Sequence, residues 1–205
     1  IGAMILNSGF LIPFIMSAFG EDGLARLLLF DFTNGILVFT FIYYQAVKYG
    51  GTNGEHKTLT KKFLRSAPLW ALLIAMLLNL SHTSFPIPIK SFLKISGDMT
   101  IPLMMLSLGI FFNPKLHKAK LVAVGIFIRM GIGLGLGILL SYLFNLDGLN
   151  RIIVIIGSAA PIGFNTLTFA SLEDLDKEFA ASLVSASILI GILYTPLLIY
   201  LFNIS

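Results

Sequence analysis

The sequence has no cysteine in its 205 residues and only three histidines. Without cysteine the chain has no disulfide, no thiolate nucleophile and no cysteine-ligated metal site. His56, His82 and His117 lie in polar stretches between apolar runs, and none has a second histidine or an acid at metal-ligand spacing. The apolar runs contain no serine–histidine pair of the kind that would indicate an intramembrane protease. These absences argue against an enzyme and predict neither a metal site nor a bound cofactor.

Charged residues are also scarce, at 12% of the chain, whereas hydrophobic residues make up 57% and the mean hydropathy is +0.92. This composition excludes an ordinary soluble domain. The net charge of +4 is carried by short stretches between apolar runs, which is the pattern of membrane topology and not of a nucleic-acid-binding surface. The sequence therefore predicts an all-α protein whose main partner is the lipid bilayer, with no nucleic acid.

Seven apolar runs are long enough for a helix to cross a hydrocarbon core of about 30 Å. We expect spans at about 1–19, 24–47, 63–80, 89–112, 121–144, 149–171 and 179–202. The polar loop 49–62, rich in glycine, threonine, asparagine and lysine, is the candidate linker. The chain starts within an apolar run without a preceding basic segment, so we expect no signal peptide there and interpret the sequence as the later part of a longer chain.

Two of these spans contain residues that interrupt a helix. One has Asn7, Gly9 and Pro13 within a single run, and the other has Pro161, Gly163 and Asn165. Proline removes a backbone donor and glycine loosens the chain, so we expect breaks near Gly9–Pro13 and Ala160–Asn165. Hydrocarbon offers no hydrogen-bond partners, so a break must be buried in protein or line a cavity. A proline kink packed against neighbouring helices is the alternative for each.

The two interrupted spans also correspond by position. Shifting the chain by 152 residues places Gly9 on Pro161 and Pro13 on Asn165, and it aligns the apolar run 24–44 with 176–196. Paired interrupted spans in corresponding halves indicate the binding site of a secondary transporter. Five crossings separate the two spans, so we expect them to run antiparallel. We therefore divide the chain into 1–48, the end of a first repeat, and 63–205, a second repeat of five helices.

Lysine and arginine placement predicts the orientation in the membrane. Of the 14 such residues, nine fall on one side of the expected topology, four fall on the other, and Arg129 lies inside a span. The richer side carries the loop 49–62. Because lysine and arginine accumulate in cytoplasmic loops, we expect this loop to be cytoplasmic and the C-terminus to lie outside the cell.

The interrupted spans carry a family resemblance. Asn7–Pro13 followed by Phe19–Ala25 resembles the first broken helix of the auxin efflux carrier family, whose bacterial members are malate or malonate permeases. Gly97–Gly109 resembles the mid-chain signature of that family, Arg129 stands where it has an arginine, and Ala160–Ala170 resembles its second broken helix. The asparagine-to-proline spacing of the first break is one residue shorter than the family usually has. The family has ten spans in two repeats of five, so the resemblance implies that the first three spans of the first repeat are missing from this sequence.

The resemblance implies a secondary carrier, either an efflux carrier or a permease, of small organic anions such as malate and other carboxylates. It would lie in the plasma membrane and hold its substrate between two broken helices that cross near the midplane. By the same resemblance, residues 63–112 would form a scaffold and residues 121–205 a moving crossover bundle. A homodimer is one candidate assembly.

Polar and helix-breaking residues near the two breaks are the candidate substrate-binding set. The amides of Asn7 and Asn165 could donate to a carboxylate or cap a freed half-helix. The guanidinium of Arg129 could attract the anion or could contact a neighbouring acid or carbonyl. The full set is Asn7, Ser8, Pro13, Pro161, Asn165, Thr166 and Arg129.

Three further residues are candidates for coupling or gating. Asp31 and Asn34 lie inside the second span, where an ionisable group is costly and usually functional. They could carry a coupling H⁺ or Na⁺, or Asp31 could simply lie near the interface. Asp98 matches the family signature. Two other classes stay open: a sodium-coupled symporter of the bile-acid type, and a non-transporting membrane assembly or sensor subunit.

Overall fold

The computed structural model describes residues 1–50, 67–81, 85–99, 102–103, 106, 110 and 117–203. Within these ranges the regular structure is helical, and the β-type pairing consists of one isolated antiparallel bridge between Leu6 and Ile162. Three helical stretches, 8–49, 119–143 and 177–202, are long and apolar enough to cross a membrane. The predicted all-α membrane fold is therefore confirmed.

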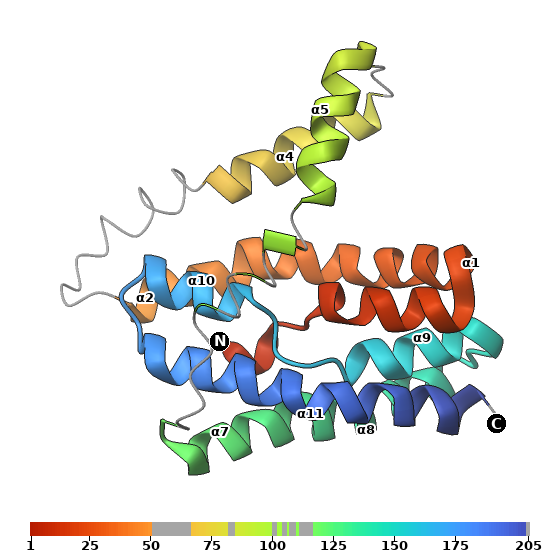
Figure 1. The fold of residues 1–205 in the computed structure, drawn as a ribbon, viewed down its shortest axis with the longest axis vertical. Helices are drawn as coiled ribbons and strands as arrows, with labels where there is room; N and C mark the ends of the chain where they lie inside the picture. Colours follow the sequence, from red (N-terminus) through yellow and green to blue (C-terminus); the bar gives the residue numbers. More distant parts are fainter. Residues whose placement is uncertain are drawn as a thin grey trace.

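The first two predicted spans form a helical hairpin. A short 3₁₀ helix, η1 (Gly2–Met4), precedes α1 (Ser8–Leu37), which continues through a π-helical turn, η2 (Val38–Ile42), into α2 (Tyr43–Tyr49). Gly20 within α1 has φ 62°, a left-handed conformation that favours glycine. The ribbon of α1 doubles back there, so its two arms lie side by side (Figure 1).

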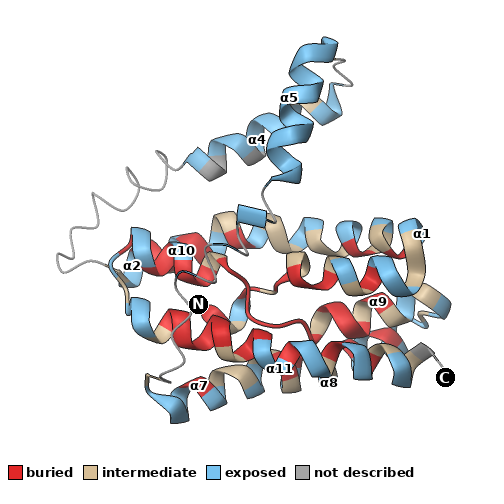
Figure 2. Ribbon diagram, viewed as in Figure 1, coloured by how far each residue is buried: buried red, intermediate tan, exposed pale blue. Residues whose placement is uncertain are grey.

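Helices α4 (Ala67–Leu80) and α5 (Ile87–Asp98) project away from the other helices (Figure 1). None of the residues of α5 is buried, and the described side chains of α4 are almost all exposed (Figure 2). These helices fall within the region 63–112 that the sequence assigns to a scaffold. Residues 51–62 of the predicted linker lie outside the described part of the chain.

The second half of the chain supplies the remaining helices. One bent span consists of α7 (Ala119–Ile126), a π-helical turn η3 (Phe127–Ile132) and α8 (Gly133–Leu143). It is followed by α9 (Gly148–Ser158), α10 (Asn165–Leu172) and α11 (Lys177–Asn203). The α8–α9 pair approaches closely at Gly133, where an added Cβ would lie 2.2 Å from the carbonyl oxygen of Ser158.

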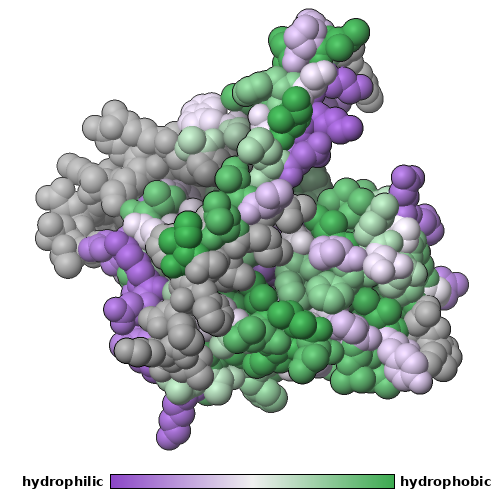
Figure 3. Space-filling view, viewed as in Figure 1, coloured by the Kyte–Doolittle hydropathy of each residue, from purple (hydrophilic) through white to green (hydrophobic). Residues whose placement is uncertain are grey.

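The core lies between the hairpin arm of α1, the helix α9 and the helix α11, and Figure 2 shows buried residues on their facing sides. Leu11, Ile15, Ile156 and Val184 are each at most 1% exposed in this cluster. The outer surface also carries large hydrophobic areas, as Figure 3 shows for one face. Because lipid is as apolar as these side chains, close van der Waals packing stabilises the core more than removal from solvent does.

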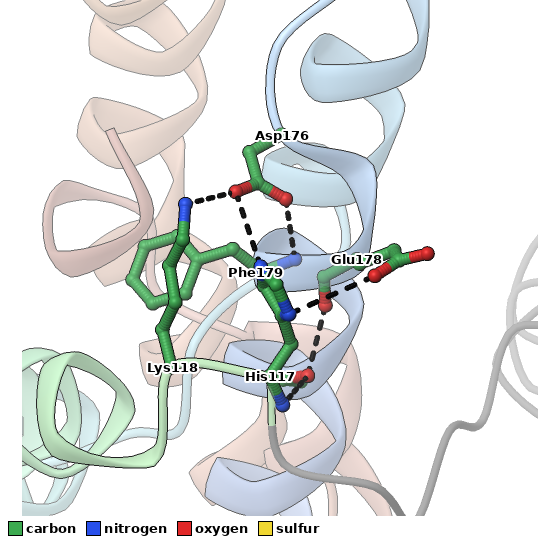
Figure 4. Close-up of polar contacts among 6 residues, drawn as sticks. His117, Lys118, Asp176, Glu178 and Phe179 are labelled. Atoms are coloured by element: carbon green, nitrogen blue, oxygen red, sulfur yellow. Dashed lines mark hydrogen bonds and ion pairs between the residues drawn. The ribbon is translucent and has the colours of Figure 1, made fainter.

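One end of the bundle carries a polar cluster that joins α7 to α11 (Figure 4). The carboxylate of Asp176 accepts hydrogen bonds from Lys118 Nζ at 2.5 Å and from the backbone N–H of Phe179 at 2.9 Å, so it caps α11. His117 lies 3.7 Å from Asp176 and 3.7 Å from Glu178.

These contacts affect how Asp176 titrates. Its hydrogen bonds from Lys118 and then from Phe179 lower the pKa of this carboxyl below its ordinary value. A lowered folded-state pKa means that the stabilisation is present above the pKa of the unfolded chain and is lost as pH falls through the folded value. The contribution is small because the group is solvent-exposed.

The opposite end of the bundle holds the turn at Gly20 and the start of α9. Arg26 pairs with Asp22 and donates from Nε to the Asn150 side-chain oxygen at 2.8 Å. The start of α9 thus lies at one end of the bundle, and the end of α2 and the starts of α7 and α11 lie at the other (Figure 1). By their places in these elements, Arg26 and Arg151 belong to the first end and Lys48, Lys118 and Lys177 to the second.

Candidate functional site

The two helix breaks cross each other in the centre of the bundle. The backbone N–H of Asn7 donates to the carbonyl of Pro161 at 3.0 Å, and the N–H of Gly163 donates to the carbonyl of Ile5 at 2.9 Å. Leu6 and Ile162 therefore face each other as an antiparallel bridge. Each break therefore supplies hydrogen-bond partners to the other. This pairing matters in a membrane, because hydrocarbon offers no partners to free backbone groups.

The first break lies earlier than the sequence predicts. The helix α1 begins at Ser8 and continues through Gly9 and Pro13, so the predicted break at Gly9–Pro13 is wrong and the non-helical segment is 5–7. Pro13 removes one intrahelical bond, to the carbonyl of Gly9, but it is exposed and the helix passes it. The Asn7 side chain caps α1, so the helix can start before the proline.

Asn7 is bonded on both sides of its amide. Its Oδ1 accepts from the backbone N–H of Phe10 at 3.1 Å, and its Nδ2 donates to the carbonyl of Ile162 at 3.4 Å. The residue is 4% exposed. Ser8, the first helical residue, is half-buried beside it. The Asn7 amide thus connects the two breaks, with one of its two N–H donors and one acceptor position in use.

The second break follows the predicted position. The helix α9 ends at Ser158, α10 starts at Asn165, and the residues between them are non-helical and buried. The N–H of Ile162 donates to the Ser187 hydroxyl at 3.1 Å. Pro161 packs against α11, where a Cβ added at Gly191 would lie 2.5 Å from its ring.

Arg129 holds the end of α9. Its Nε donates to the carbonyl of Ala160 at 3.2 Å, and its Nη2 donates to the carbonyl of Gly157 at 3.4 Å. These carbonyls belong to the C-terminal end of a half-helix, which carries partial negative charge. The π-helical turn η3 contains Arg129 and brings the guanidinium to this end. Within the described residues, its Nη1 has no hydrogen-bond acceptor.

Asn165 and Thr166 start α10 and differ from Asn7 in their contacts. The side-chain amide of half-buried Asn165 has no hydrogen-bond partner in the described part of the chain. The Thr166 hydroxyl is buried, with the residue 5% exposed, and it also lacks a partner there. Buried polar atoms without partners are uncommon and call for a ligand or water.

The electrostatics of the crossing are asymmetric. The N-terminal ends of α1 and α10 both lie close to the bridge between Leu6 and Ile162, because α1 begins at Ser8 and α10 at Asn165, and each end carries partial positive charge. The C-terminal end of α9, which would oppose them, is neutralised by Arg129. The segments 1–13 and 157–166 contain no acidic residue. The site therefore has a positive balance at its centre.

The coupling and gating candidates do not join this group. Asp31 Oδ1 accepts from Asn34 Nδ2 at 2.8 Å, and both residues are half-buried on the second arm of α1. Asp98 is exposed at the end of α5, on the pair of helices that projects from the bundle. The structure thus brings together Asn7, Ser8, Pro161, Asn165, Thr166 and Arg129, but not Pro13, Asp31, Asn34 or Asp98.

One buried acid, Glu173, is not among the residues predicted from the sequence. Glu173, 5% exposed, follows α10 and accepts a hydrogen bond from the Tyr43 hydroxyl at 3.0 Å. Its place in the acidic run Glu173–Glu178 makes it look like part of a solvated loop. The signal that could have found it is its position directly after an apolar helix.

Comparison with known proteins gives consistent results. A family model described as "Membrane transport protein" matches residues 4–199. An uncharacterized transporter of Methanocaldococcus jannaschii is 28% identical over 187 residues, covering 88% of this chain and 60% of that protein. An uncharacterized transporter of Methanothermobacter thermautotrophicus is 28% identical over 200 residues, covering 96% of this chain and 65% of that protein. The chain spans less than two thirds of the length of each relative.

Proposed function

This chain belongs to the Membrane transport protein family, and from that premise we propose that it carries small organic anions such as carboxylates across the membrane. The substrate would bind at the crossing of the two broken helices. The observation that carries the proposal is the pair of half-helix N-termini that start beside the crossing, together with the side-chain amide of Asn165, which has no partner in the described part of the chain.

The charge balance favours an anion over a cation. A helix N-terminus stabilises a nearby negative charge by about 0.3–1 kcal/mol, and by up to ~2 kcal/mol when partly buried. Two such ends act together here, and the Asn165 amide can donate to a carboxylate. A cation site would need carboxylates or free carbonyls, but neither break contains an acid and Arg129 occupies the carbonyls of α9.

The two asparagines allow a direct test. We expect Asn165→Ala to weaken carboxylate binding by about tenfold, because one hydrogen bond to a charged ligand is lost, and to leave the melting temperature nearly unchanged. Asn7→Ala should instead lower the melting temperature, because it removes a helix cap and a bond between the breaks. The measurements are ligand affinity and thermal unfolding of the purified full-length protein for both variants.

A panel of di- and monocarboxylates, together with amino acids and cations as controls, would define the ligand class. Uptake into vesicles with and without H⁺ or Na⁺ gradients would identify any coupling ion. If cations alone bind, or if Asn165→Ala unfolds the protein while its folded fraction binds normally, the anion site is not at this crossing.

The orientation that we propose places the loop 49–62 in the cytoplasm of a plasma-membrane protein, with the C-terminus outside. Residues 1–205 contain no cysteine, so a cysteine introduced here is the only one in this part of the protein. A membrane-impermeant maleimide added to intact cells should label Glu21→Cys, at the opposite end of the bundle, and should label Thr52→Cys only after the cells are opened. Labelling of Thr52→Cys in intact cells would reverse the topology.

A further inference from the structure

We propose that a groove between α8 and α9 is a binding site for one anionic phospholipid. Its phosphate would lie on Arg151, and an acyl chain would lie along the apolar part of α8. The groove has a volume of about 590 Å³, within the usual range for small-molecule sites. It is lined by Gly135, Ile138, Leu139, Ser141, Tyr142, Asn145, Leu146 and Arg151.

The lining of the groove changes from apolar to polar along α8. Gly135, Ile138 and Leu139 form the apolar part, and Tyr142 lies in the last turn of the helix. From Gly135 to Tyr142 the rise is about 10 Å. Asn145 and Arg151 follow beyond the end of the span 119–143. This order matches a lipid at the membrane boundary, where acyl chain gives way to head group within a similar depth.

The surroundings of the groove are those of a lipid-facing surface. Leu139 is 57% exposed and Tyr142 is 82% exposed on one of the most apolar helices of the protein. Tyrosine is enriched at the membrane interface, because its ring is apolar and its hydroxyl is polar. A soluble anion would gain nothing from contact with the apolar side chains of Ile138 and Leu139, whereas an acyl chain would.

The charge of Arg151 is available to a ligand. Its guanidinium is exposed and forms no ion pair with another described residue, including Asp147 one turn before it. The backbone carbonyl of Asp147 accepts the backbone N–H of Arg151 at 3.3 Å, and Asp147 does not line the groove. The nearby Arg26 is already occupied by Asp22 and Asn150. The planar donors of an arginine suit the oxygens of a phosphodiester.

Gly135 offers a way to block the groove without changing its charge. A Cβ added there would meet nothing within 4 Å, so there is open space for a larger side chain. Alanine should leave the groove open, whereas leucine should fill its apolar part. Both residues favour a helix more than glycine does, so neither variant should unfold α8.

The test is native mass spectrometry of the full-length protein in uncharged detergent, titrated with phosphatidylglycerol and, separately, with phosphatidylcholine. We expect Arg151→Gln to weaken phosphatidylglycerol retention by about tenfold, because a charge-assisted contact is lost. Gly135→Leu should weaken retention of the same lipid, whereas Gly135→Ala should not. Lys120→Gln is the matched control, because it removes an exposed cation at the other end of the same span.

Three outcomes would overturn the proposal. Equal retention of phosphatidylglycerol by wild type, Arg151→Gln and Gly135→Leu would show that the groove holds no lipid. Arg151-dependent binding of inorganic phosphate, with lipid retention unaffected by Gly135→Leu, would make it a free-anion site. Efficient disulfide dimerisation of Leu139→Cys in vesicles would show that a second copy of the chain covers the groove instead.

Discussion

Replacing Arg129 with alanine is expected to lower the stability of the folded protein by about 1–3 kcal/mol and to abolish transport. The substitution removes the donor to the carbonyl of Ala160 and one donor to the carbonyl of Gly157, which also accepts the backbone N–H of Ala160 at 3.2 Å. A buried carbonyl left without a partner, here that of Ala160, costs about 1–3 kcal/mol. The crossing would also lose the positive charge that balances the negative end of α9.

Thermal unfolding and substrate uptake, measured on the same preparations, would check this expectation. Arg129→Lys keeps the charge but cannot reach two carbonyls with fixed planar donors, so it should be intermediate in both measurements. Lys120→Ala is the control, because that cation is exposed on the same span and forms no ion pair with another described residue, and it should change stability by less than about 0.5 kcal/mol. An Arg129→Ala variant as stable as wild type would mean that the carbonyls of α9 do not depend on this residue.

Alanine at Gly163 and at Gly9 is expected to have effects of opposite sign. A Cβ at Gly163 would lie 2.6 Å from the carbonyl oxygen of Leu6 and 2.6 Å from the side chain of Ile5, so the two breaks would be forced apart. We expect a loss of about 1–3 kcal/mol and a severe loss of uptake. At Gly9 the nearest atom would be 3.7 Å away, an ordinary contact within a helix, and alanine should be neutral or stabilising by up to about 1 kcal/mol.

The comparison of these glycines distinguishes two positions for the first break. If the chain were interrupted at Gly9–Pro13, as its composition indicates, Gly9→Ala would be the damaging substitution and Gly163→Ala the milder one. Melting temperatures of the two variants, ranked against wild type in one detergent, are sufficient to decide between them.

The second break could be predicted from sequence and the first could only be approximated. Pro161 and Gly163 lie within the non-helical segment, so the local signal and the structure agree. In the first span the interrupted residues are Ile5 and Leu6, which are apolar and carry no such signal. Their conformation is set by partners about 155 residues away, as the separation of Asn7 and Ile162 shows. Local sequence cannot encode a contact of that kind.

The candidate site shows the same limit. Asn7 and Asn165 look equivalent in sequence, each beside a proline and a glycine in an interrupted span. The structure gives them different surroundings, because Asn7 is bonded on both sides and Asn165 has an unpaired amide within the described residues. The sequence also does not predict that the Ser187 hydroxyl accepts a hydrogen bond from the N–H of Ile162, because small hydroxyl residues in apolar helices usually allow close helix packing.

The bridge between Leu6 and Ile162 has a consequence for how the protein is made. Ribosomes add about 5–20 residues per second, so the segment around Leu6 is synthesised about 8–30 seconds before its partner exists. During that interval the N–H of Asn7 and the carbonyl of Ile5 have no bridge to complete them. Since hydrocarbon offers no hydrogen-bond partners, these two groups need other partners, such as water at the membrane surface, until α9 and the segment beyond it have been inserted.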